Sequence, residues 1–386
     1  MLQLRNSSRY KQLNKDKNQN QYMNFASSAQ KDENYYLPDD FEKIPKVDAH
    51  LHYSTFNDAY LKYAGSINMR LFTINTDLGT PINTQFEIAK SLKNSHPSLI
   101  DFIGTFSPTN FFDRNFARKT IEQIERYMDA GAKGIKIWKN IGMALQDKSG
   151  KYIMVDDPAF SPIFAFLEKN RIPLLAHLGE PRNCWLPYDD ITLDGDLLYY
   201  KNNPEYHMYQ HPEVPTHEQQ IAARDNLLER YPQMKFIGAH LGSLEWNIDE
   251  VASRLDRYPN FFVDLSARMG HIQLQVIPDR EKVRNFFVKY KNRLLYGSDC
   301  SISGKSIGIK SKILKQVAPD IFVKRICKTL YRTCKNDWLF LATGEMVPVE
   351  KINITNAPET IEGLKLPKQV IDQIFNKNAD QIYQVG

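Results

Sequence analysis

Apolar runs of strand length alternate with amphipathic stretches of helical spacing from residue 41 onwards. The apolar runs lie at 44–52, 67–76, 99–107, 134–138, 172–180, 235–242, 261–268 and 293–301. The amphipathic stretches between them lie at 84–94, 113–132, 157–170, 216–232, 247–257 and 280–290. Strand and helix patterns in alternation predict an α/β fold with a parallel sheet.

Eight parallel strands are the number that closes a (β/α)8 barrel, which needs about 250 residues. Residues 41–386 therefore leave room for loop insertions, such as the irregular stretch 181–216, and for extra C-terminal helices, such as 366–383. A doubly wound open sheet is the alternative. It usually carries a glycine-rich phosphate loop, but no GxGxxG follows the first apolar run. We therefore predict an α/β TIM barrel over residues 41–386.

Residues 1–40 differ from the rest of the chain because they are rich in Asn, Gln, Lys and Ser. Such a composition buries too little apolar surface to fold, which predicts a disordered polar tail. The segment lacks the apolar stretch of a signal peptide, so we expect a cytoplasmic protein, with a degraded export sequence as the alternative. No apolar run approaches the roughly 20 residues of a membrane helix, so no membrane partner is expected.

The composition is that of a globular protein, with 42% hydrophobic and 25% charged residues. The net charge of +5 is small and the basic residues are scattered, which argues against a nucleic-acid partner. Four cysteines without a CxxC pair predict reduced thiols. We expect a small-molecule substrate as the partner, and a homo-oligomer stays an open alternative.

Histidines and one aspartate fall where the apolar runs end. His50 and His52 end the first run, His177 the fifth, His240 the sixth, and Asp299 the eighth. The carboxyl ends of TIM-barrel strands carry the catalytic groups. Residues i and i+2 of a strand point to the same face, so the two histidines of "DAHLH" are expected side by side.

Imidazole and carboxylate side chains are ligands that zinc and its neighbours accept, and a catalytic site leaves one position for water. A bound metal lowers the pKa of such a water towards about 7. The carboxylate of Asp299 suits a group that takes the proton from that water. The paired imidazoles of His50 and His52 thus indicate half of a metal site.

The ordered motifs "DAHLH", "GIKIWK", "LLAHLGEP", "FIGAHLGSLEW", "VDLSAR" and "LLYGSDCS" resemble the amidohydrolase superfamily. The nearest resemblance is to the amidohydrolase-related group that includes aminocarboxymuconate semialdehyde decarboxylase, and it spans about residues 41–386. The resemblance implies a metal-dependent TIM barrel. It further implies that His50, His52, His177 and Asp299 bind the metal. His240 is implied as an acid/base or an electrophile that polarises the substrate.

Lys136 matches the position at which binuclear relatives carry a carbamylated bridging lysine. The decarboxylase-like group mostly uses one metal and does not need this carbamate. We favour the alternative that Lys136 pairs with a carboxylate or holds a substrate anion. One divalent metal per chain, zinc, is therefore expected, with a second metal if Lys136 is carbamylated.

Further polar and aromatic residues follow the strands and are candidates for substrate binding. Arg268 suits a substrate carboxylate, or else pairs with Asp264. Glu180 and Arg182 line the pocket or brace their loop. Trp138, together with Trp185 and the tyrosines of 188–209, forms a lid or packs the loop. The other histidines are expected in loops or on the surface, with His271 the main exception because it follows Arg268: His96, His207, His211, His217 and His271.

Two reactions fit these residues. The first is hydrolysis of a small-molecule amide, lactone or ester by a metal-activated water, with Asp299 moving the proton and His240 stabilising the oxyanion. The second is non-oxidative decarboxylation or hydration of a small carboxylated substrate on the same metal site. We favour the hydrolase because the resembling superfamily mostly hydrolyses.

Overall fold

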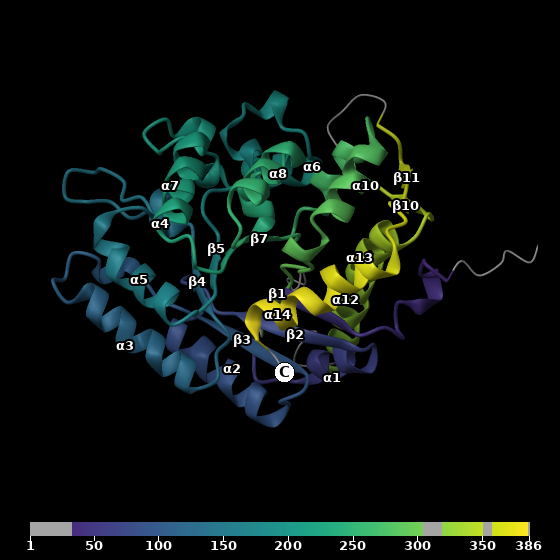
Figure 1. Ribbon diagram of the computed structural model, residues 1–386, viewed down its shortest axis with the longest axis horizontal. Helices are drawn as coiled ribbons and strands as arrows, with labels where there is room; N and C mark the ends of the chain where they lie inside the picture. The colour runs from purple at the N-terminus through teal and green to yellow at the C-terminus, as the bar shows by residue number, and fades with distance from the viewer. Residues whose placement is uncertain (1–32, 304–318, 350–356, 385–386) are drawn as a thin grey trace, which may run out of the picture.

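The computed structural model describes residues 33–303, 319–349 and 357–384. Its main sheet is made of parallel strands in the order β8-β7-β6-β5-β4-β3-β2-β1-β9 (Figure 1). The strands are β1 (Lys46–Ser54), β2 (Met69–Ile74), β3 (Ile100–Thr105), β4 (Ile135–Ile137), β5 (Leu174–Ala176), β6 (Phe236–Gly238), β7 (Phe261–Asp264), β8 (Leu294–Leu295) and β9 (Ser301–Ser303).

The sheet closes on itself through the last segment of the barrel. Strands β8 and β9 lie at opposite ends of the strand order, yet only residues 296–300 separate them in the chain. Within that segment the carbonyl of Tyr296 accepts from Ala49 N at 3.0 Å, and Asp299 N donates to the carbonyl of His50 at 2.7 Å. Residues 294–303 thus join β7 on one side to β1 on the other. The predicted α/β barrel is confirmed.

Helices connect the strands and cover the outside of the barrel. They are α1 (Ala59–Ser66), α2 (Ile82–Ser95), α3 (Phe116–Asp129), α4 (Asn140–Met143), α5 (Ser161–Lys169), α6 (Asp194–Asn202), α7 (His217–Arg230), α8 (Ile248–Arg257), α9 (Met269–Val276) and α10 (Arg280–Lys289). Sequence periodicity predicted α2, α3, α5, α7, α8 and α10. The Thr216 side chain accepts from Gln219 N and caps α7.

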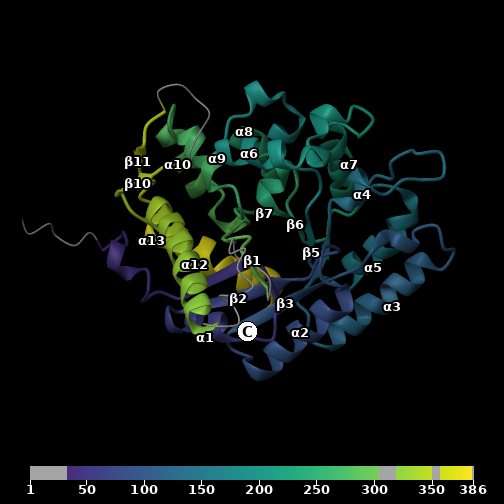
Figure 2. The ribbon, with the colours of Figure 1, turned by 180° about the vertical axis from the view of Figure 1, so that it is seen from behind.

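The C-terminal part adds the helices α12 (Pro319–Ala342), α13 (Lys368–Asp372) and α14 (Asn378–Tyr383), as expected. Helix α12 packs on α1 (Figure 2). An antiparallel pair, β10 (Met346–Pro348) and β11 (Thr360–Glu362), was not predicted. Within the described part of the chain, no helix combines the length and apolar character needed to cross a bilayer.

The barrel interior is filled by one layer of apolar side chains, closed by α14. Val47, Ala49, Phe72, Ile74, Ile103, Leu175, Ile237, Ala239 and Leu295 cluster with Ala379, Ile382 and Tyr383. The Tyr383 ring stacks on Phe72 at 4.9 Å. Because α14 fills one end of the barrel, the functional cavity lies at the other.

An irregularity in β1 places the histidines at that cavity. The pairing of β1 with β2 shifts register between Asp48 and Leu51. Val47 and Ala49 belong to the interior layer, whereas Leu51 packs with the helices outside. A bulge thus exchanges the faces within β1, as bulges near active sites commonly do, and His50 and His52 still lie side by side as expected, with ring centroids 5.5 Å apart. Asp48 lies on the outer face with its Oδ1 accepting from Ser298 N at 2.9 Å.

The last residues of the predicted tail of residues 1–40 are ordered, which corrects that part of the prediction. The stretch from Asn34 to the turn Pro38–Asp40 contacts the C-terminal helices. Lys368 N donates to the carbonyl of Asn34 at 2.8 Å, and the Tyr36 hydroxyl donates to Asp372 at 2.6 Å. Asn34 and Tyr36 thus anchor a segment that composition alone suggested was unstructured. Residues 1–32 lie outside the described part of the chain.

Candidate metal centre and active-site cavity

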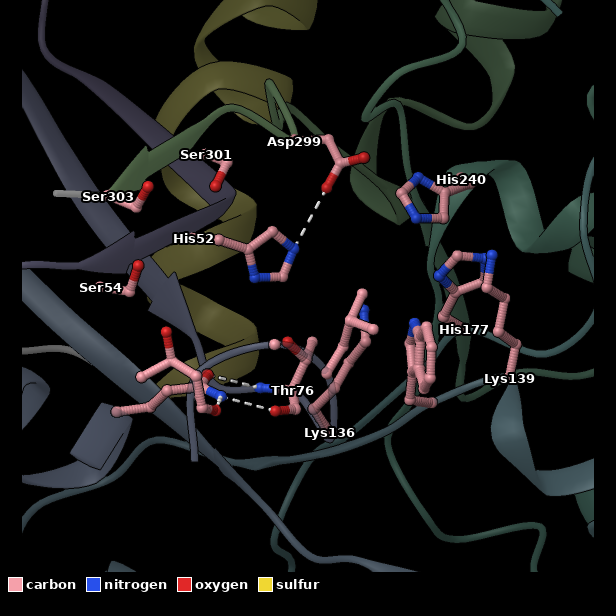
Figure 3. Close-up of a pocket in the computed structure, with 15 residues that line it drawn as sticks. His52, Ser54, Thr76, Lys136, Lys139, His177, His240, Asp299, Ser301 and Ser303 are labelled. Atoms are coloured by element: carbon pink, nitrogen blue, oxygen red, sulfur yellow. Dashed lines mark hydrogen bonds and ion pairs between the residues drawn. The ribbon is translucent and has the colours of Figure 1, made fainter. Parts of the chain in front are cut away.

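A cavity of about 440 Å³ opens where the carboxyl ends of the strands meet (Figure 3). This size suits a small molecule. Imidazoles, lysines, a carboxylate, an indole and hydroxyls form its walls. The lining includes His52, Ser54, Thr76, Thr80, Gln85, Lys136, Trp138, Lys139, His177, His240, Asp299, Ser301 and Ser303.

His50 and His52 aim ring nitrogens at the same oxygen of Asp299. Nε2 of His52 lies 3.3 Å from Asp299 Oδ1, and Nε2 of His50 lies 3.6 Å from it. His52 Nδ1 lies 2.8 Å from the carbonyl of Ile74, which can only accept, so this nitrogen carries a proton. The candidate ligand atoms of His50, His52 and Asp299 all lie within 4.8 Å of one another.

A hydrogen bond fixes the tautomer of His50. Its Nδ1 lies 2.7 Å from Oδ2 of Asp264, a carboxylate buried at the end of β7. Burial lowers the pKa of His50, with the nearby Lys136 ammonium as a further cause, so the ring is neutral near pH 7. The proton sits on Nδ1, and the Nε2 lone pair points towards Asp299. This is the carboxylate–histidine pair that typically orients a metal ligand.

The same aspartate organises His240. Asp264 Oδ1 accepts from His240 N at 2.8 Å and from the Ser266 hydroxyl at 2.5 Å. His240 Nδ1 lies 2.9 Å from the carbonyl of Ser266, so Nδ1 carries the proton here too. Burial lowers the pKa of His240 to about 3. The neutral ring thus presents an Nε2 lone pair to the cavity, which makes it a proton acceptor rather than the hydrogen-bond donor we expected.

His177 completes the set of imidazoles. Its ring packs against that of His240 with centroids 4.4 Å apart. Burial lowers its pKa well below the usual value, and its Nε2 is buried without a hydrogen-bond partner among the described residues. Oε2 of Glu180 lies 3.7 Å away. A neutral, unpartnered imidazole nitrogen facing the cavity fits a metal ligand, although it lies outside the tight cluster around Asp299.

The donor set therefore fits a divalent metal. Hydrogen bonds at Nδ1 direct the Nε2 atoms of His50 and His52 towards one carboxylate oxygen, and a third imidazole lines the same cavity. Lone pairs facing a carboxylate repel it unless a cation lies between them. Nitrogen and oxygen donors of this kind hold zinc and similar metals.

Lys136 lies inside the barrel next to these candidate ligands, on the inward face of β4. Its ammonium lies 3.3 Å from His50 Nε2. The side chain is 1% exposed, and burial lowers its pKa to about 8, although Asp264 and Asp299 oppose the change. The predicted direct pairing with a carboxylate is absent from the ion pairs of the described residues.

Strained backbone surrounds the cavity. His240, Leu241, Ser243, Ala267 and Asp299 all have φ between 54° and 59°, a region that residues other than glycine rarely adopt. Such residues concentrate at functional sites, where surrounding contacts hold them. Here hydrogen bonds from the backbone of His240 and Asp299 do so.

The predicted substrate-binding residues separate into two groups. Trp138 and Lys136 line the cavity, and Glu180 pairs with Lys139, which also lines it. Arg182 turns away: its guanidinium lies 4.3 Å from the Trp246 ring and borders a different cavity. Our expectation of Arg182 in the active-site cavity is therefore not supported.

Arg268 is 7% exposed and donates to the carbonyl of Ala267, so the predicted pairing with Asp264 is not formed. Buried histidines also differ from expectation. His207 is wholly buried beside Tyr188, and His217 Nε2 lies 2.8 Å from the carbonyl of Ser243, so both are core residues of the insertion and α7. His271 lies 3.3 Å from Asp196 Oδ2.

Sequence reasoning missed Asp264, Ser266 and Lys139 as site residues. Asp264 and Ser266 could have been found from the sequence, because they are two residues apart in "VDLSAR" and therefore share the face of the strand that points inward. Lys139 could not have been found in this way, because β4 ends at Ile137 and side chains do not alternate regularly in the turn that follows.

Comparisons with known proteins agree with this picture. The family model described as "Amidohydrolase" matches residues 103–385. None of the curated proteins compared with the chain matches it. Similar solved structures include 2,6-dihydroxybenzoate decarboxylase from Rhizobium, with 15% identity, a TM-score of 0.46, and coverage of 88% of this chain and 98% of that one.

Two further solved structures are equally distant. 4-Oxalomesaconate hydratase from Rhodopseudomonas palustris has 12% identity and a TM-score of 0.44, covering 88% of this chain and 95% of that one. An uncharacterized TIM-barrel protein from Bordetella bronchiseptica has 14% identity and a TM-score of 0.45, covering 88% and 99%. Likeness this weak does not bear on the reaction. The family match, in contrast, spans most of the chain and includes Lys136, His177, His240 and Asp299, so the chain belongs to the amidohydrolase family.

Proposed function

We propose that the protein is a metal-dependent hydrolase of a small-molecule amide, lactone or ester. One divalent metal per chain, zinc, is held by His50, His52 and Asp299, with His177 as the fourth ligand. The convergence of two imidazole Nε2 atoms on one oxygen of Asp299 carries this proposal. When bound, such a metal lowers the pKa of a water molecule towards about 7 and polarises a carbonyl.

The chain's own residues supply the proton transfers. His240 Nδ1 faces the carbonyl of Ser266, which leaves Nε2 as the proton acceptor towards the cavity, so this atom takes a proton from the attacking water. The imidazolium then returns this proton to the leaving nitrogen or oxygen. Asp299 is the second acceptor within the cavity, beside His52. A positioned base of this kind typically contributes about 10²- to 10⁴-fold in rate.

Lys136 suits the stabilisation of negative charge on the reacting carbonyl oxygen. It lines the cavity, and its buried ammonium lies beside the ligand His50. Fixed positive charge in a site shielded from water stabilises a transition-state oxyanion without reorganisation.

A decarboxylase or hydratase acting on a small carboxylated substrate is the second candidate. The basic residues at and behind the cavity favour it, since Lys136, Lys139 and Arg268 would attract a carboxylate. This chemistry uses the same ligands and moves one proton through His240 or Asp299.

A substrate screen separates the two reactions. We would assay the zinc-loaded protein on lactones, amides and esters by acid release, and on aromatic carboxylates by carbon dioxide release. Turnover of neutral lactones or amides, lost in His240→Asn, supports the hydrolase. Carbon dioxide release without any hydrolysis overturns it in favour of the decarboxylase.

A further inference from the structure

Lys139 occupies a wall of the cavity that the reaction proposed above does not use. It lies between β4 and the short helix α4, and its side chain is 16% exposed. Figure 3 shows it beside His177, on the side of the cavity opposite Ser54, Ser301 and Ser303. Its ammonium forms an ion pair with Glu180, whose side chain is 10% exposed.

Two aromatic rings and one carboxylate hold this ammonium in place. Its Nζ lies 5.5 Å from the Trp138 ring and 5.9 Å from the ring of Tyr206, which belongs to the 181–216 insertion. These contacts fix a long side chain that otherwise loses much rotamer entropy on binding a ligand. Lys139 is therefore preorganised as a positive group at the wall of the cavity.

The charges around the site leave room for an anion. The buried or half-buried charged groups at and directly behind the cavity include Lys136, Lys139, Arg268, Glu180, Asp264 and Asp299. A bound divalent metal would add further positive charge to this wall, which favours a negatively charged substrate.

We propose that Lys139 is the specificity residue of this cavity and selects substrates that carry a carboxylate which does not react. This carboxylate binds on the His177 side, while the remainder, rich in hydroxyl or amide groups, extends towards Ser54 and Thr76. Glu180 holds the ammonium in the empty cavity and competes with the substrate for it. The inference rests on the proposed function, because it places the reacting bond at the metal between these two ends.

A pair of probes that differ by one charge tests the inference. N-acetyl-β-alanine and its neutral amide, N-acetyl-β-alaninamide, would be titrated into the zinc-loaded protein at pH 7, with the fluorescence of Trp138 in the cavity wall as the readout. We expect the acid to bind at least tenfold more tightly than the amide. Equal affinities for the two probes would overturn the proposal.

Variants of the ion pair sharpen the test. Lys139→Met keeps the apolar stem but removes the charge, so the dissociation constant of the acid should rise about 10- to 100-fold while that of the amide stays the same. Lys139→Arg should keep the preference. Glu180→Gln removes the competing carboxylate and should tighten binding of the acid. Lys148→Met, at an exposed lysine outside the cavity, is the matched control.

The outcomes distinguish this inference from the proposed hydrolase. A preference for the acid that persists in Lys139→Met would assign anion binding to the metal and overturn the role of Lys139, even in an active hydrolase. If Lys139→Met does not fold, Glu180→Gln provides the test. Weaker binding of the acid by this variant than by the native protein would contradict the proposal. Conversely, a charge preference that depends on Lys139 stands even if no amide, lactone or ester is turned over.

Discussion

His50 donates its Nδ1 proton to Asp264 at 2.7 Å, and this one hydrogen bond decides where the other ring nitrogen points. The lone pair of Nε2 then faces Asp299. Asp264 also holds the backbone of His240 and the hydroxyl of Ser266. A single buried carboxylate thus orients both a candidate metal ligand and the candidate base.

We therefore predict that Asp264→Asn weakens metal binding. An amide accepts less strongly and cannot serve all of these donors, and loss of such an orienting partner typically costs about 10- to 100-fold in metal affinity. Competition with a chromophoric chelator would measure the change. Asp101→Asn is the control, because Asp101 is a buried barrel carboxylate that pairs with Lys93 instead. An unchanged affinity in Asp264→Asn would reduce Asp264 to a structural residue.

His240→Asn should keep the metal and lose turnover. The ring contacts Ser266 through Nδ1, and an Asn side chain cannot take up a proton at the position of Nε2. We expect kcat to fall by about 10²- to 10⁴-fold with little change in KM. Steady-state kinetics paired with metal analysis would show it. Loss of the metal would instead make His240 a ligand.

The barrel architecture and the gathering of the candidate residues at one cavity could be predicted, because both follow from the periodicity of apolar and polar positions. Apolar runs of period two mark strands, and a polar residue at the end of a run lies at the carboxyl edge of the sheet. His52, His177, His240 and Asp299 reach one cavity for this reason. Lys136 reaches the same cavity because side chains alternate along β4, which turns Lys136 inward.

The alternation of side chains along a strand no longer predicts their direction where the backbone leaves the strand. Arg182 was a candidate because it follows the fifth apolar run closely, but after Pro181 the chain enters a 3-10 turn and the guanidinium lies over the Trp246 ring instead. The bulge in β1 likewise separates Asp48 from His50. The register shift has no residue pattern of its own, because it depends on how β1 pairs with β2.

Anion binding should depend on pH through Lys139. Burial lowers the pKa of Lys139 to about 8, while Arg268 and Lys136 add repulsion and Asp299 opposes the change. The ammonium is charged below pH 8 and loses its proton above it. The affinity for N-acetyl-β-alanine should therefore fall about tenfold per pH unit above pH 8. Lys139→Arg, whose group stays charged, should give a shallower decline than the native protein, although Lys136 with its pKa of about 8 still titrates. An identical decline in Lys139→Arg would contradict the assignment.

The contact of Tyr36 with the C-terminal helices should stabilise the fold. Its hydroxyl donates to Asp372 at 2.6 Å, and its ring lies 5.8 Å from that of Trp338. Tyr36→Phe should lower the free energy of unfolding by about 1 kcal/mol. Urea denaturation would measure it against Tyr35→Phe, whose hydroxyl has no such bond. Equal stabilities of the two variants would show that Tyr36 only rests on the surface.

The central claim is that His50 and His52 of β1 hold a divalent metal with Asp299. Elemental analysis of the protein purified without added metal tests this most directly, on the native chain and on the double variant His50→Ala/His52→Ala. We predict one zinc per native chain and none in a double variant whose circular dichroism remains native. Two metals per native chain would instead indicate a carbamylated Lys136. A stoichiometric metal retained by the double variant would contradict the account.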